Sequence, residues 1–205
     1  MRTLLFILVL VFSVSAQSNF TEATNFALNG QYEKALASYR AAQSNAKDAE
    51  SSARVHYNIG VCLYRLDRPA DAVPELQEAL RLKGDRYRQA WYALGMAQVG
   101  LKNTAAARKA FMQAVALDKK DAEAWFDLGL VLIAEKELPA ALEAFQKAVE
   151  FRSLNSADAH NNIGVIRALS GDIAAAIREF ELSGSAEAAG NLKYWRERAG
   201  RVAKW

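Results

Sequence analysis

The sequence predicts an all-α protein in which about five helix–turn–helix repeats form an α-solenoid, followed by a C-terminal capping helix. Two periodic signals carry this prediction. Glycines recur at intervals of 35, 34 and 35 residues. An alanine followed four positions later by a bulky apolar residue recurs five times, at intervals of 37, 35, 34 and 35. A period of this length is typical of repeat arrays, in which each unit packs on its neighbours. The anchors are Gly60, Gly95, Gly129 and Gly164, and the pairs Ala35/Tyr39, Ala72/Leu76, Ala107/Phe111, Ala141/Phe145 and Ala176/Phe180.

Each repeat has residue types that suit two facing helices. Trp125, Leu128 and Gly129 stand at positions i, i+3 and i+4, which lie on one face of a helix. Glycine on that face has no side chain, so we expect a second helix to approach it closely. Phe145 and its small neighbours form the matching face of the second helix.

Turn and cap signals separate the two helices of each repeat. They contain glycine, proline, or an Asp or Thr that can cap the following helix. These signals are Asn29-Gly30, Asp67–Pro69, Lys102–Thr104, Glu137–Pro139 and Gly171-Asp172.

The repeats resemble the tetratricopeptide repeat (TPR) family, whose 34-residue unit carries W-x2-L-G-x2-Y and then A-x3-F. The third and fourth repeats match closely, with Trp91 and Trp125 at the tryptophan position, whereas the second and fifth have His56 and His160 there. The resemblance implies a right-handed superhelix. It divides the chain into repeats at about 17–50, 53–86, 88–121, 122–155 and 157–188, with a capping helix at 189–205.

The N-terminus predicts export. Arg2 precedes an apolar run over residues 4–14, and small residues follow as far as Ala16. This pattern is typical of a cleaved secretory signal peptide at residues 1–16. A membrane anchor is the alternative, but the run is short of the roughly 20 residues that a spanning helix needs. We therefore expect a periplasmic or secreted protein with no membrane span after cleavage.

The net charge and the cysteine content argue against a nucleic-acid partner and against an internal disulfide. A formal net charge of +3 is too small to favour a nucleic-acid partner. The single cysteine, Cys62, allows no internal disulfide. Its place in a helical run favours a small core residue over a reactive thiol.

No catalytic or metal-binding motif is present in the sequence, and we predict neither an enzyme nor a cofactor. The two histidines lie three repeats apart, so in a solenoid they cannot share a metal, and we expect each to be partly buried. The sequence contains no glycine-rich phosphate loop, no G-x-S-x-G and no Cys/His cluster. An accessory subunit of an enzyme complex, or an enzyme of an unrecognised type, stays as an alternative.

The resemblance implies that the first helix of each repeat lines a concave groove that binds a protein or peptide. Three mostly apolar rows fall there, which favours an apolar helix or extended segment as partner. A clamp for an acidic terminus is not expected, because only Asn58 of its usual residues is retained. Packing between successive first helices is the alternative role for these side chains. The candidates are Tyr57, Asn58, Val61, Tyr64, Tyr92, Met96, Val99, Phe126, Asp127, Leu130, Ile133, Asn161, Asn162 and Val165.

The C-terminal stretch predicts a helix with an apolar stripe, formed by Leu192, Trp195, Ala199 and Val202, and a basic opposite face. A solvated cap is one interpretation and a basic anchor for acidic partners is the other. Taken together, the sequence predicts an exported scaffold or adaptor in envelope protein assembly. The alternative is a structural homo-oligomer in which a second copy fills the groove.

Overall fold

The computed structural model describes residues 19–202, in which every regular element is a helix. The predicted signal segment lies outside the described residues. The first described helix covers residues 19–28. The others are α2 (Tyr32–Gln43), α3 (Ala49–Arg65), α4 (Pro69–Leu82), α5 (Arg88–Gly100), α6 (Thr104–Leu117), α7 (Ala122–Ala134), α8 (Leu138–Glu150), α9 (Ser156–Leu169), α10 (Ile173–Ser183) and α11 (Ala186–Val202).

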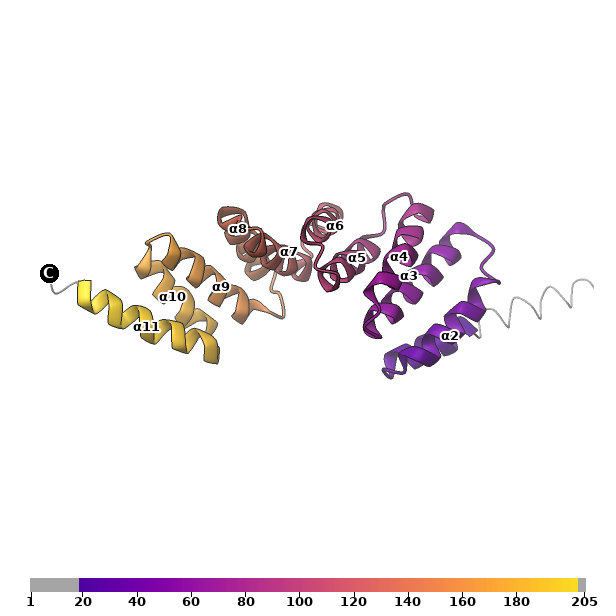
Figure 1. The fold of residues 1–205 in the computed structure, drawn as a ribbon, viewed down its shortest axis with the longest axis horizontal. Coiled ribbons are helices and arrows are strands. Elements are labelled where there is room, and N and C mark those ends of the chain that lie inside the picture. Colours follow the sequence, from indigo (N-terminus) through magenta and orange to yellow (C-terminus); the bar gives the residue numbers. More distant parts are fainter. Residues whose placement is uncertain (1–18, 203–205) are drawn as a thin grey trace, which may run out of the picture. The chain divides into compact units, whose positions relative to one another are not determined.

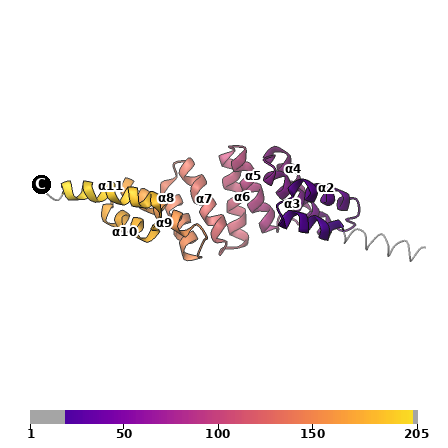
Figure 2. The same cartoon turned by 90° about the horizontal axis from the view of Figure 1, so that it is seen from below.

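The helices pair in sequence order as hairpins. Helix α3 packs on α4, α7 on α8, and α9 on α10, and the two helices of each pair lie next to each other in Figure 1. The first described helix contacts α2 through Tyr39, whose hydroxyl lies 3.1 Å from the Thr24 hydroxyl and whose ring lies 5.3 Å from that of Phe20. At the other end, α11 packs on α10 and α9, and both views show it beside that hairpin (Figures 1 and 2).

The chain forms two compact units, with the boundary between Ala110 and Phe111. Each unit has a buried core built from the periodic anchors. In the first unit Tyr39 and Leu76 are fully buried, and in the second Phe145 and Phe180 are. The alanine and bulky apolar residue of each repeat therefore form the core that the period predicted.

Glycines mark the closest approaches between paired helices, as the sequence predicted. A Cβ built on Gly129 would lie 2.7 Å from the Phe145 ring, and one on Gly164 would lie 2.6 Å from the Phe180 ring. These distances are shorter than a carbon–carbon contact allows. Glycine is therefore needed for the second helix to pack at this separation.

The turns inside the hairpins share one conformation. The residue at the equivalent position of each turn has a positive φ, between 56° and 88°. Glycine adopts this left-handed region easily, whereas other residues pay a steric cost. Glycine stands there in the first and last repeats and a charged residue in the three between: Gly30, Asp67, Lys102, Lys136 and Gly171.

Two helices begin at least three residues earlier than the repeat boundaries expected from the sequence. Helix α3 begins at Ala49, before residue 53, because the Asp48 carboxylate accepts a hydrogen bond of 2.8 Å from the Ser51 amide and caps the helix. Helix α11 begins at Ala186, before residue 189. Gly184, at a φ of 62°, ends α10, and the Ser185 hydroxyl accepts a hydrogen bond from the Ala188 amide.

Candidate functional site

In the first unit, α3 carries four of the predicted groove residues, and all are half-buried: Tyr57, Asn58, Val61 and Tyr64. The Tyr57 ring packs on that of Tyr87, which directly precedes α5, with centroids 5.1 Å apart. The Asn58 amide donates a hydrogen bond of 2.8 Å to the Arg54 carbonyl in its own helix. This side of α3 is therefore held in place before any partner binds.

Burial also moves the ionisation of two aromatic hydroxyls of this region, those of Tyr57 and Tyr87, further above neutral pH. It raises the pKa of Tyr57, and it raises the pKa of Tyr87 to about 12, with a smaller contribution from the neighbouring Tyr57. Both side chains act as uncharged, mainly apolar groups at neutral pH.

Helix α5 carries the next three predicted groove residues, which become more exposed along the helix. Tyr92 and Met96 are half-buried, and Val99 is 46% exposed. Val99 is therefore the predicted groove residue of this unit with the largest exposed fraction.

In the second unit, α7 places its four predicted groove residues differently. Leu130 is 42% exposed, and Asp127 and Ile133 are half-buried. Phe126 is only 7% exposed, because its ring packs edge-on against that of Phe145, with centroids 5.6 Å apart. Phe126 was expected on the groove surface, but its side chain belongs to the core of the α7–α8 hairpin.

Helix α11 covers part of the predicted rows on α9. Asn161 is 4% exposed, and its side-chain oxygen accepts a hydrogen bond of 2.9 Å from the Asn191 amide of α11. Val165 packs against a core cluster on which Leu192 and Trp195 of α11 also pack. Asn162 is half-buried. Asn161 was expected to face a partner, but it faces the C-terminal helix, because that helix continues the stack.

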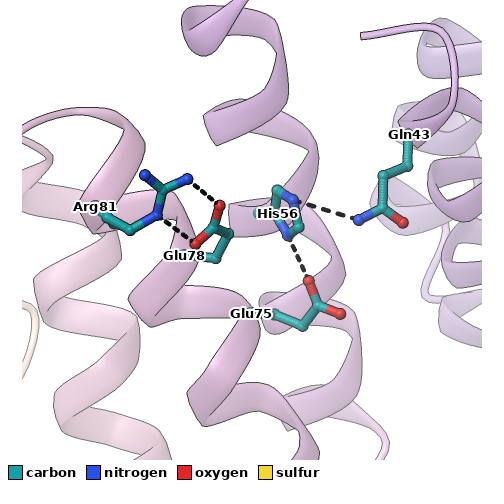
Figure 3. A network of polar contacts seen from close by, with 5 residues as sticks. All are labelled: Gln43, His56, Glu75, Glu78 and Arg81. Atoms are coloured by element: carbon teal, nitrogen blue, oxygen red, sulfur yellow. Dashed lines mark hydrogen bonds and ion pairs between the residues drawn. The ribbon is translucent and has the colours of Figure 1, made fainter.

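The two histidines make equivalent hydrogen-bonding contacts with the second helix of their own repeat. The His56 Nδ1 atom lies 2.6 Å from a Glu75 carboxylate oxygen, and the His160 Nδ1 atom lies 2.8 Å from one of Glu179. Figure 3 shows that His56 also faces Gln43 of the preceding repeat, with 3.3 Å between the two nitrogens. The histidines are half-buried, as predicted, and each ties two helices together.

The tryptophans at the equivalent position line surface concavities, which the sequence analysis missed. The indole N–H of Trp91 donates to the Asp85 carbonyl, and that of Trp125 to the Lys119 carbonyl, both at 2.9 Å. The Trp91 ring lines a concavity of about 500 Å³, and the Trp125 ring one of about 380 Å³. We call these the Trp91 notch and the Trp125 notch. The recurrence of tryptophan at the same repeat position was the sequence feature that could have pointed to these concavities.

Two observations on the described residues concern a metal site and a thiol nucleophile. No three His, Cys, Asp or Glu side chains among residues 19–202 lie close enough together to hold a metal ion. Cys62 is buried, and burial raises the pKa of its thiol to about 11, which makes it a poor nucleophile at neutral pH. None of the described helices has both the length and the apolar character that crossing a bilayer requires.

Two family models of the tetratricopeptide repeat match the chain, one over residues 51–120 and the other over residues 92–156. The chain belongs to the tetratricopeptide repeat family. The matched segments contain both Trp91 and Trp125, the residues that carried the resemblance in the sequence. Among curated proteins, none matches the TPR chain significantly.

Solved structures with the same fold cover most of the TPR chain. YrrB, described as a TPR protein with an unusual peptide-binding site, is 25% identical, with 89% of this chain and 97% of YrrB covered and a TM-score of 0.72. MamA from Desulfovibrio magneticus RS-1 is 22% identical over 87% of this chain and 95% of its own, with a TM-score of 0.72. Pseudomonas aeruginosa pilF is 16% identical over 93% of both chains, with a TM-score of 0.73.

These similarities confirm the predicted fold class, an all-α solenoid of the TPR type. TPR proteins are generally non-catalytic scaffolds, and their fold suggests protein or peptide binding.

Proposed function

We propose that this chain is an exported TPR scaffold that binds a protein or peptide partner through the surface of its first helices, in the assembly of envelope proteins. Membership of the TPR family supports the binding role, and so does the similarity to YrrB, a TPR protein with a peptide-binding site. The signal-like segment at residues 1–16 supports export.

One observation carries the proposal: predicted groove residues leave apolar side chains exposed in both units. Val99 of α5 and Leu130 of α7 are more than two-fifths exposed, although each stands in a helix whose other faces are packed. Exposed apolar side chains on a rigid helix gain free energy when a partner covers them. Val99 and Leu130 are therefore the first positions to test.

The binding surface can be tested by crosslinking in the cell. A photo-reactive amino acid in place of Met96 in the first unit, or separately of Ile133 in the second, should form specific adducts, identified by mass spectrometry. Val99→Asp should remove the Met96 adducts and Leu130→Asp the Ile133 adducts with little loss of stability, because both substituted side chains already face solvent. Leu182→Asp, at a 64% exposed position of α10 outside the predicted rows, is the matched control and should leave them intact.

Two results would overturn the binding proposal. Adducts that persist in both Asp variants would mean that another surface binds the partner. Adducts that contain only a second copy of the chain, together with a dimer mass in light scattering, would favour the structural homo-oligomer instead.

Export has a separate test. Intact-mass measurement of the envelope fraction should give a chain that begins at Gln17. A chain of full mass that retains Arg2 and remains in the membrane pellet would contradict cleavage of the signal peptide. That result would not bear on the binding surface, which the crosslinking experiment tests separately.

A further inference from the structure

The Trp125 notch lies within the second unit and is lined by α6, α7 and α8. Its walls are almost entirely apolar, with Met112 from α6, Trp125 from α7 and Phe151 from the end of α8. Met112 is 52% exposed at the edge of the notch. A volume of about 380 Å³ is enough for one large aliphatic or aromatic side chain.

The polar atom of the largest wall residue is already used. The Trp125 indole N–H donates to the Lys119 carbonyl, so the ring offers the notch only carbon surface. The same bond fixes the ring orientation through the chain's own backbone. The site is therefore preformed, and an entering apolar side chain leaves no polar group of the indole without a hydrogen bond.

The rim of the notch carries two cations, one of which is already paired with a carboxylate. Lys119 and Lys147 are its only charged lining residues among the described part of the chain, and both are cations. The Lys147 ammonium lies 2.7 Å from the Glu150 carboxylate and 5.6 Å from the centre of the Phe151 ring, which places it directly beside the apolar wall. Because Lys147 is paired with Glu150, Lys119 is the rim cation that would attract a carboxylate next to the inserted side chain.

The Trp91 notch of the first unit has the same backbone arrangement but different chemistry. Its lining includes the cations Arg81 and Lys109, but also the carboxylate of Asp85. It also includes Gln98, whose side-chain oxygen is buried and accepts no hydrogen bond from the described residues. An apolar side chain flanked by acids suits this notch less well. It serves as a control within the same chain.

We propose that the Trp125 notch is a second protein-binding site, which holds a segment of another protein that places one large apolar side chain between acidic residues. The notch and the predicted groove use different faces of α7. Trp125 and Leu128, three residues apart, share the face that lines the notch, whereas Leu130 and Ile133, also three residues apart, share another face. The proposal therefore extends the scaffold role: one partner occupies the first-helix surface and another the notch.

The test uses the full chain labelled with ¹⁵N and the peptide acetyl-Gly-Glu-Phe-Glu-Gly-amide as probe. The Trp125 indole N–H signal, assigned by its loss in Trp125→Phe, should shift on titration, and the Trp91 signal should shift much less. Two control peptides, one with Gln for both Glu residues and one with Ser for Phe, should each bind at least about fivefold more weakly. Raising the salt concentration should weaken binding of the acidic peptide.

Variants then test whether the peptide binds in the notch. Met112→Asp puts a carboxylate at its edge and should weaken binding by about tenfold or more, and Lys119→Glu should weaken it by roughly tenfold. Lys109→Glu, the matched charge reversal in the Trp91 notch, should leave the affinity unchanged. Val99→Asp should also leave it unchanged, which separates this site from the predicted groove.

Three results would overturn the proposal. The Gln peptide could bind as tightly as the acidic one, which would remove the role of the rim. Sodium oleate could shift the Trp125 signal while no peptide does, which would make the notch a site for a lipid-like acid. The labelled chain could dimerise through the notch, so that Met112→Asp makes it monomeric without any peptide binding.

Discussion

Two neighbouring hairpins of the second unit, α7–α8 and α9–α10, are built on the same repeat but use one position in opposite ways. At this position α7 has Trp125 and α9 has His160. The indole bonds to the backbone six residues before it and lines an apolar notch, whereas the imidazole pairs with Glu179 on the following helix. The residue at this position of the repeat thus either lines a surface concavity, as Trp125 does, or connects two helices through a hydrogen bond, as His160 does.

A second position changes together with the first. Nineteen residues after each histidine stands a glutamate, and nineteen after Trp91 and after Trp125 stands a buried alanine. The imidazole is small and polar, so a carboxylate both fits beside it and bonds to it. The larger indole requires a small neighbour. The four pairs are His56/Glu75, Trp91/Ala110, Trp125/Ala144 and His160/Glu179.

The largest expected effect on stability concerns a feature that the two hairpins share, the glycine at the contact between their helices. Gly129→Ala and Gly164→Ala each place a Cβ within 2.7 Å of a buried phenylalanine ring, so each should destabilise by about 1–3 kcal/mol in urea denaturation. Gly190→Ala in α11 meets no atom within 4 Å, and should instead stabilise by up to about 1 kcal/mol. Equal midpoints for all three variants would contradict the close-packing interpretation.

Exchanging the paired residues tests the difference directly. His160→Trp alone should cost about 2 kcal/mol, because the indole crowds Glu179 and leaves its half-buried carboxylate without the histidine. Adding Glu179→Ala should recover at least half of this loss in the same urea measurement. His56→Trp with Glu75→Ala repeats the test in the first unit. A double variant no more stable than the single one would show that the pairing is incidental.

The turns offer a smaller contrast. Lys136 in the α7–α8 turn has a φ of 64°, where a side chain is strained, whereas the α9–α10 turn has Gly171 at 88°. Lys136→Gly should therefore stabilise by about 0.5–1 kcal/mol, and Gly171→Lys should destabilise by about 1 kcal/mol. Lys136→Ala keeps the strain and should change the free energy of unfolding by less than about 0.5 kcal/mol. Thermal unfolding of the three variants would show this order or refute it.

The smallest expected effect concerns the indole hydrogen bond. Trp125→Phe removes the N–H that bonds to the Lys119 carbonyl but keeps an aromatic wall, and the carbonyl can bond to water instead. The cost should be about 0.5 kcal/mol, and Trp91→Phe should cost about the same. A loss several times larger in either variant would mean that the tryptophan is a core residue and that its notch is a consequence of packing.

The sequence by itself determined the repeat and its core, because burial of a periodic face leaves a period in the sequence. The glycines, the alanines and the large residues of the second helices could be assigned to the core from their spacing alone. So could the turns, since glycine, proline and capping residues act locally. The half-buried state of the histidines followed from their place on the same face.

Only the tertiary structure decided which predicted groove residues face solvent. Phe126 and Leu130 are one helical turn apart and both apolar, yet the first packs against Phe145 and the second is exposed. Asn161 is buried because α11 crosses it, a contact between residues 30 positions apart. Spacing within one repeat specifies the face of a helix, but burial depends on which other elements cover that face. Such coverage is a property of the assembled chain, and so are the notches beside Trp91 and Trp125.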